Sequence, residues 1–223
     1  MRTFSEENYI KAIWKLIGPE EDPVSTNAIA AAVQTKAASV TDMLKKLSDK
    51  KLIDYTPYKG VSLTKEGQRA AAEVVRKHRL WEVFLVEQLG FGWDEVHDIA
   101  EQLEHIQSEA LTEKLDRFLG FPKVDPHGDP IPDKSGKIAG EPGFALALAG
   151  SLKTVVVTGV SDHSSSFLRF LDSNNIRLGD TIVIREITEY DQSMTIQLKS
   201  KKLLHISHEV SRNILVRNNA KRK

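Results

Sequence analysis

The sequence predicts a mainly α-helical protein with a small β domain at its C-terminal end, and three observations support this fold class. Apolar residues recur at helical spacing up to about residue 120. A stretch rich in Pro and Gly follows, and from about residue 151 the pattern changes to short strands. The predicted domains are a winged helix-turn-helix (1–63), a helical domain (64–120), a linker (121–150) and a β-barrel (151–217).

The first domain is predicted from three helices and a hairpin. Ser5 can cap a helix that runs to about Ile17, and Ser25 can cap a short second helix. A third helix is expected over 37–50, followed by two strands around the Pro57–Gly60 turn. This order is typical of a winged helix-turn-helix, whose longer helix enters the DNA major groove. A small helical bundle with a surface hairpin is the alternative.

The formal net charge is zero, but charge is unevenly distributed along the chain. Residues 34–80 contain eleven Lys and Arg against five Asp and Glu, whereas residues 82–116 contain one Lys against ten Asp and Glu. The basic block can neutralise DNA phosphates, and the acidic block can bind cations. The candidate DNA contacts on the third helix and in the wing are Lys36, Ser39, Thr41, Lys45, Lys46 and Lys59.

Three further helices are predicted in the middle of the chain. Thr64 can cap a long helix that ends at Gly90, Asp94 opens a second helix, and Ser108 can cap a third that ends at Gly120. Large aromatic side chains in this region either fill the core or form a dimer interface, because buried and interface aromatics look alike in sequence. They are Trp81, Phe84 and Trp93.

The helix predicted to begin at Asp94 carries a polar stripe of potential metal ligands. His97, Glu101, Glu104 and His105 share one face because they are spaced i, i+4, i+7 and i+8. His78 and Glu82 repeat the i, i+4 spacing on the preceding helix. Imidazole nitrogens and carboxylate oxygens are ligands of divalent cations. A solvated polar face is the alternative, and the absence of Cys excludes thiolate zinc sites and iron–sulfur clusters.

The remainder of the chain is predicted to form a linker and a barrel. Residues 121–143 are rich in Pro and Gly and include Asp125 and His127, two more potential ligands. Several short strands follow, interrupted by a helix around Ser165–Leu171 and ending in a helical turn near His208–Ile214. No run reaches the about 18 apolar residues of a membrane span, and the N-terminus lacks a secretion signal, so a cytoplasmic location is expected.

Three motifs stand out beside the winged helix and the terminal barrel: KHRLWE (77–82), VHDIAEQLEH (96–105) and PHGDPIP (126–132). Together these features resemble the diphtheria toxin repressor and manganese transport regulator family. The resemblance covers nearly the whole chain. It implies a winged helix-turn-helix, a helical dimerisation and metal-binding domain, and an SH3-like domain related to FeoA proteins.

The resemblance also implies two metal sites. The primary site would use Asn8, Glu101, Glu104 and His105. The residues that match an ancillary site are His78, Glu82 and His97, with Asp125, His127 and either Asp162 or His163 contributed by the later segments.

Three departures from the family bear on the metal. Glu101 stands where iron-type members have Cys, which favours a hard cation such as Mn²⁺, with Fe²⁺ as the alternative. Asn8 stands where these members have Met and the manganese-type members have a carboxylate. Lys11 stands where some manganese-type members have another carboxylate, so a closely spaced binuclear cluster is not expected.

The expected function is a metal-activated transcriptional regulator, a repressor of metal-uptake genes that binds operator DNA as a homodimer. One alternative is a winged-helix regulator that senses a small molecule instead of metal. A metallohydrolase is the other, but the sequence contains no HExxH, nucleophile elbow or phosphate loop.

Overall fold

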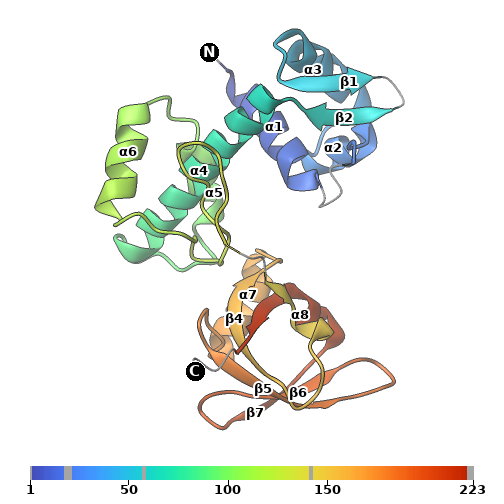
Figure 1. The fold of residues 1–223 in the computed structure, drawn as a ribbon, viewed down its shortest axis with the longest axis vertical. Coiled ribbons are helices and arrows are strands. Elements are labelled where there is room, and N and C mark those ends of the chain that lie inside the picture. The colour runs from blue at the N-terminus through green and yellow to red at the C-terminus, as the bar shows by residue number, and fades with distance from the viewer. Residues whose placement is uncertain (1, 18–21, 57–58, 141–142, 220–223) are drawn as a thin grey trace. The chain divides into compact units, whose positions relative to one another are not determined.

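The computed structural model describes residues 2–17, 22–56, 59–140 and 143–219 (Figure 1). The predicted Gly18-Pro19 helix end, part of the Pro57–Gly60 turn and the last residues of the basic tail lie outside the described residues. Two compact units are formed. The N-terminal unit comprises Met1–Trp81, Ile99–Lys123 and Ile131–Ala139, and the C-terminal unit comprises Glu82–Asp98, Val124–Pro130 and Gly140–Lys223.

The N-terminal unit begins with the predicted winged helix-turn-helix. Its elements are α1 (Phe4–Leu16), α2 (Thr26–Ala32), α3 (Ala37–Asp49), β1 (Ile53–Thr56) and β2 (Gly60–Leu63). The two strands pair antiparallel, and Val24 bridges to Val61. Apolar residues from α1, α3 and the hairpin form one buried core, in which Ile10, Ile13 and Leu44 are fully buried.

The cap of α1 differs from the prediction. Thr3, not Ser5, is the N-cap, and its hydroxyl accepts from the Glu6 backbone N–H at 3.3 Å. The Glu6 carboxylate accepts in return from the Thr3 N–H at 2.9 Å, so the two residues form a capping box. Ser5 lies inside the helix.

The middle helices are α4 (Lys65–Glu87), α5 (His97–Leu103) and α6 (Glu109–Phe118). The Thr64 and Ser108 hydroxyls accept from backbone N–H groups at the starts of α4 and α6, as predicted. The second of these helices is shorter than predicted, because α5 begins at His97 and not at Asp94. Glu104 and His105 therefore lie in the turn that follows α5.

The β domain is a six-stranded antiparallel sheet in the order β3-β8-β4-β5-β6-β7. Its strands are β3 (Phe144–Ala145), β4 (Thr154–Val160), β5 (Thr181–Ile187), β6 (Met194–Gln197), β7 (Leu203–Ile206) and β8 (Ile214–Asn218), with η1 (Leu146–Leu148), α7 (Ser165–Ser173) and α8 (His208–Asn213) between them. The sequence prediction missed β3 and β8, although β8 pairs with both β3 and β4.

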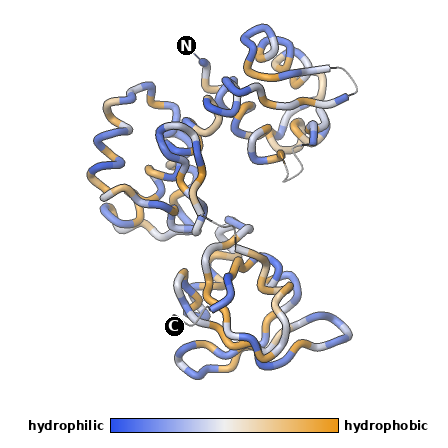
Figure 2. Tube along the Cα trace, viewed as in Figure 1, coloured by the Kyte–Doolittle hydropathy of each residue, from blue (hydrophilic) through white to orange (hydrophobic). Residues whose placement is uncertain are grey.

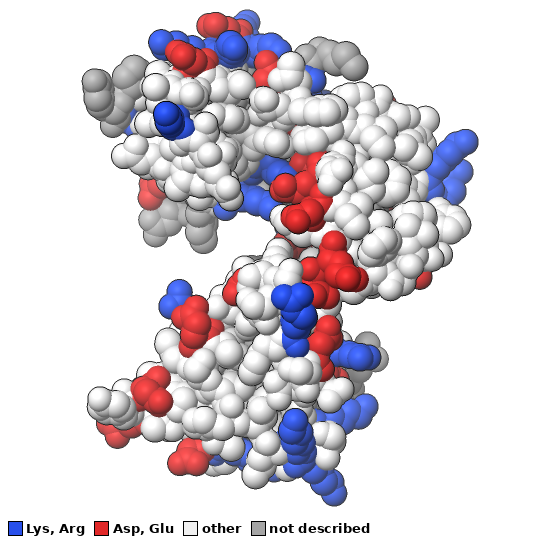
Figure 3. Space-filling model, turned by 180° about the vertical axis from the view of Figure 1, so that it is seen from behind, with Lys and Arg blue, Asp and Glu red and all other residues white. Residues whose placement is uncertain are grey.

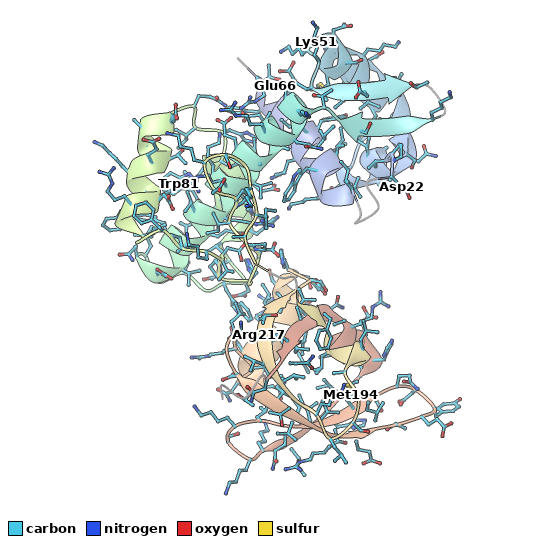
Figure 4. The ribbon with its side chains drawn as sticks, viewed as in Figure 1. Asp22, Lys51, Glu66, Trp81, Met194 and Arg217 are labelled. Atoms are coloured by element: carbon cyan, nitrogen blue, oxygen red, sulfur yellow. The ribbon has the colours of Figure 1, made fainter. Side chains whose placement is uncertain are left out.

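Buried side chains from the strands and from α7 form the core of this domain. Met194 of β6 is buried, whereas Arg217 of β8 is exposed (Figure 4). Hydrophobic segments lie in the strands and the long loops are mostly hydrophilic (Figure 2). Among the described residues, no helix is long and apolar enough to cross a membrane.

Candidate metal centres

The N-terminal unit brings several ionisable side chains from three elements together. Glu7 and Lys11 come from α1, and His78 comes from α4. Glu104 and His105 follow α5, where Glu104 keeps a backbone hydrogen bond to Ala100 at 2.8 Å. All five of these side chains are buried. Glu101 of α5 completes the cluster and is the more accessible member, with a side chain 47% exposed.

Glu7 fixes the orientation of His105. Its Oε2 accepts from His105 Nδ1 at 2.7 Å, and its Oε1 accepts from the Gln107 amide at 2.7 Å. Because a carboxylate accepts, the neutral tautomer of His105 that fits this contact has its proton on Nδ1 and its lone pair on Nε2. That nitrogen is 3.8 Å from Oε1 of Glu104. A histidine whose second nitrogen donates to a carboxylate is the usual arrangement of a metal-binding imidazole.

Glu104 lies at the centre of the cluster. Its Oε2 accepts from His78 Nδ1 at 2.6 Å, and its Oε1 accepts from the Lys11 ammonium at 2.6 Å. Burial raises the pKa of Glu104, but hydrogen bonds and positive charge from His78 and Lys11 outweigh it and lower the pKa below its usual value. Glu104 is therefore ionised at neutral pH and can bind a cation.

The donor types of this cluster suit a divalent cation, but Glu101, Glu104 and His105 do not form a group whose ligand atoms all lie within 4.8 Å of one another. Glu101, Glu104 and the Nε2 of His105 offer two carboxylates and one oriented imidazole, all without sulfur. Such nitrogen and oxygen ligands suit Mn²⁺ and Fe²⁺, although later metals also bind them.

The C-terminal unit contains a second group of potential ligands. Glu82, Asp125 and His127 each offer one atom, and these atoms all lie within 4.8 Å of one another. All three residues are buried. Asp125 and His127 are held by a tight turn, because Oδ1 of Asp125 accepts from the backbone N–H groups of His127 and Asp129.

His127 is oriented as a metal ligand. Its Nε2 donates to the backbone carbonyl of Trp93 at 2.8 Å, which leaves the lone pair on Nδ1. This Nδ1 is buried without a hydrogen-bond partner among the described residues, and Oε2 of Glu82 lies 3.8 Å away. A buried nitrogen that faces a carboxylate at more than hydrogen-bond distance fits a cation between them.

The electrostatics of this group also favour a cation. Burial lowers the pKa of His127, but the Glu82 carboxylate and the charge of Asp125 outweigh it and raise the pKa above its usual value. The negative charge that attracts a proton to His127 attracts a metal ion as well, and the two compete for the same nitrogen.

Of the other residues predicted for the ancillary site, His97 and His163 lie beside Glu82 and His127, whereas Asp162 makes a different contact. His97 Nδ1 lies 3.4 Å from Oε1 of Glu82, so Glu82 lies between two imidazoles. His163 stacks on His127 with ring centroids 4.6 Å apart. Asp162, in contrast, accepts from the Ser164 backbone N–H at 2.8 Å as part of the turn before α7.

Asn8 and Glu7 differ most from the sequence prediction. Asn8 is exposed, whereas Glu7 is fully buried and contacts His105. Glu7 was not predicted as part of the site, although a signal existed: Glu7 and Lys11 are spaced i, i+4 and therefore share one face of α1.

The predicted DNA-contacting residues lie on the surface of α3 and the wing. Lys36, Ser39, Lys45, Lys46 and Lys59 are exposed. Thr41 is half-buried and its hydroxyl donates to the Ala37 carbonyl at 3.1 Å. Figure 3 shows basic side chains, with acidic ones among them, at the end of the unit that carries α3.

Comparison with known proteins covers almost the whole chain with three family models. Residues 1–61 match the iron dependent repressor N-terminal DNA binding domain, and residues 64–133 match the iron dependent repressor metal binding and dimerisation domain. Residues 144–218 match the FeoA domain.

Individual relatives agree with these matches. The iron-dependent repressor IdeR of Mycobacterium tuberculosis is 31% identical over 166 residues, covering 70% of this chain and 72% of that protein. The transcriptional regulator MntR of Oceanobacillus iheyensis is 33% identical over 125 residues, covering 56% and 84%. A solved manganese-dependent transcriptional repressor in complex with manganese is 34% identical, with a TM-score of 0.87 over 96% of this chain and 99% of that chain.

Proposed function

The chain belongs to the iron-dependent repressor family, and from that premise we propose that it is a Mn²⁺-activated repressor of metal-uptake genes that binds operator DNA as a homodimer. Fe²⁺ is the alternative metal. The family consists of metal-dependent, DNA-binding transcriptional regulators and not of enzymes, so the chain is a metal-activated DNA-binding regulator.

The orientation of His127 carries the proposal that this chain binds metal itself. Its Nε2 proton is fixed by the Trp93 carbonyl, and the remaining lone pair is buried opposite Glu82. His105 repeats this arrangement in the N-terminal unit, with Glu7 in place of the carbonyl. Both groups offer oxygen and nitrogen donors, and the chain contains no Cys, which favours a hard cation such as Mn²⁺.

The position of the N-terminal cluster supports a link between metal and DNA binding. Helix α1 contributes Glu7 to the cluster and Ile10 and Ile13 to the core of the DNA-binding domain. When bound, the ion supplies positive charge that holds the ligands around it together. Fixing the turn after α5 against α1 would therefore restrict the orientation of α3 and the wing. Asn8, one residue from Glu7, remains a proposed ligand on the resemblance alone.

Metal-dependent DNA binding tests this function. Fluorescence anisotropy measures binding of the chelated protein to labelled DNA from upstream of a metal-uptake operon, before and after addition of Mn²⁺, anaerobic Fe²⁺ or Zn²⁺. Restoration by Mn²⁺ or Fe²⁺ in the wild type, and its loss in Glu104→Gln, are expected. Glu113→Gln is a matched control, because Glu113 is exposed on α6. Equal binding with and without metal would overturn the proposal.

The DNA surface is tested with the same assay at several salt concentrations. Lys45→Ala is expected to weaken binding and to lower the slope of log affinity against log salt by about one, because each Lys that contacts a phosphate releases about one counterion. Lys202→Ala, exposed in the β domain, is the control and should leave the slope unchanged. An unchanged slope in Lys45→Ala would argue against a phosphate contact at this position.

A further inference from the structure

Lys11 is a buried cation inside the N-terminal cluster. Its side chain is 7% exposed, and its Nζ lies 2.6 Å from Oε1 of Glu104 and 3.1 Å from Oε1 of Glu101. A buried ammonium is costly unless it is paired, so these two carboxylates must be what holds Lys11 in this position.

The ammonium shares its central partner with a potential metal ligand. Oε1 of Glu104 contacts Lys11 and is also 3.8 Å from the Nε2 of His105, the nitrogen that carries the lone pair. Glu101, Glu104 and His105 are the donors proposed for the metal. Lys11 Nζ is therefore already bound to two of the three groups that an ion at this site would use.

We propose that Lys11 is a tethered competitor of the metal: its ammonium neutralises Glu101 and Glu104 in the metal-free protein and must be displaced before an ion binds there. This inference rests on the proposed function of the cluster. It makes Lys11 a residue that sets the metal concentration at which the regulator responds.

The charges of the cluster explain why such a competitor is effective. The cluster contains three carboxylates, those of Glu7, Glu101 and Glu104, and Glu104 is fully buried. Lys11 compensates part of this charge and so stabilises the metal-free state. A ligand gains only the difference between its own interactions and those already present, so every interaction that Lys11 makes lowers the apparent metal affinity.

The structure also provides a route for displacement. Lysine has a flexible four-carbon stem, and its ammonium is strongly hydrated. Glu101, one of its two partners, is about half exposed, so the cluster is open to solvent on this side. The ammonium can therefore exchange its carboxylate partners for water without unfolding of α1.

The test compares Lys11→Met with Lys15→Met. Lys15 lies one turn further along α1 and carries the same charge. It interacts electrostatically with Glu101 and Glu104 but forms no ion pair with either among the described residues, so it controls for a general electrostatic effect. Both substitutions are made in a His127→Ala background, so that a Mn²⁺ titration followed by the electron paramagnetic resonance of free Mn²⁺ reports on the N-terminal cluster. Thermal unfolding of the metal-free protein is measured in parallel.

Lys11→Met is expected to bind Mn²⁺ about tenfold or more tightly, which is the scale of one charge-assisted hydrogen bond, while its metal-free form melts at a lower temperature. Lys15→Met should tighten Mn²⁺ binding less than Lys11→Met does, because Lys15 acts on Glu101 and Glu104 through longer-range charge and not through an ion pair. Opposite changes in affinity and metal-free stability are the signature of a competitor. A merely structural role of Lys11 would lower both.

The inference would be overturned if Lys11→Met bound Mn²⁺ no more tightly than the His127→Ala parent. The proposed metal site would remain intact in that case if the parent binds Mn²⁺ and Glu104→Gln abolishes this binding. Failure of the proposed site itself has a different result, because the parent would then bind Mn²⁺ no better than Glu104→Gln does. In that case Lys11 has no metal to compete with, and the inference is overturned as well.

Discussion

Replacing Glu7 by Gln tests the most unexpected feature of the N-terminal cluster. The substitution keeps the size of the side chain and an oxygen that can accept from His105 Nδ1, but it removes the negative charge. Glu7 is fully buried and accepts at 2.7 Å from both His105 and Gln107, so the loss is not compensated by solvent. We expect the imidazole to become a weaker metal ligand and its orientation to be held less firmly.

The magnitude follows from the role of Glu7 as the partner of a metal-binding histidine. Removing such a partner typically lowers metal affinity about 10- to 100-fold, equivalent to about 1.4–2.7 kcal/mol. Because Gln retains an acceptor, Glu7→Gln should lie near the tenfold end. Asn8→Ala is the competing substitution, because Asn8 is the ligand that the resemblance implies. If exposed Asn8 is not a ligand, a surface change of up to about 0.5 kcal/mol alters the affinity only about twofold.

The assay is a Mn²⁺ titration of both variants, with thermal unfolding of the metal-free proteins to confirm that each is folded. Metal-dependent DNA binding should shift to higher Mn²⁺ concentration by the same factor as the affinity. If Asn8→Ala weakens Mn²⁺ binding tenfold and Glu7→Gln does not, then Asn8 is the ligand that the family resemblance implies, and the role assigned to Glu7 is refuted.

Three further predictions follow from the geometry. His127→Ala should remove one bound Mn²⁺ per chain in equilibrium dialysis. Asp162→Asn should not, because Oδ1 of Asp162 accepts from the Ser164 backbone N–H. Equal stoichiometry in wild type and His127→Ala would refute the second site. Gly128→Ala should destabilise the protein by more than about 2 kcal/mol in urea unfolding, because at φ +91° a Cβ would lie 2.2 Å from the Thr158 carbonyl oxygen. Gly120→Ala, at φ +73° with nothing within 4 Å of an added Cβ, is its control and should cost only about 1 kcal/mol, so equal losses would argue against the clash. Burial raises the pKa of Glu6, but the Lys50 ammonium and the Thr3 N–H outweigh it and hold that pKa below the usual 4.5. The ionised carboxylate therefore stabilises the fold above about pH 4.5, and this contribution is lost as the pH falls through the lowered pKa. Melting curves of Glu6→Gln should depend less on acid pH than those of the wild type, and parallel curves would contradict this assignment.

The sequence by itself determined the features that depend on local spacing. The helix caps at Ser25, Thr64 and Ser108 and the strands β4 and β5 are encoded by residues close together in the chain, and the structure confirms them. The chemical character of the metal groups was also readable, because His, Asp and Glu without Cys limit the ligands to nitrogen and oxygen. β8 escaped detection because its sequence, ILVRN, is a short apolar run without alternation, and its pairing with β3 and β4 is long-range.

Only the tertiary structure decided which of these side chains meet. Successive residues on a helix point about 100° apart, so the packing of α1 places Glu7 in the cluster and leaves Asn8 exposed. The end of α5 at Leu103 places Glu104 and His105 in a turn instead of on a continuous helical stripe. Lys11 is buried between Glu101 and Glu104, from which it is separated by 90 and 93 positions in the chain. Helical spacing fixes which face a residue occupies, but the packing of helices against one another fixes the partner that this face contacts.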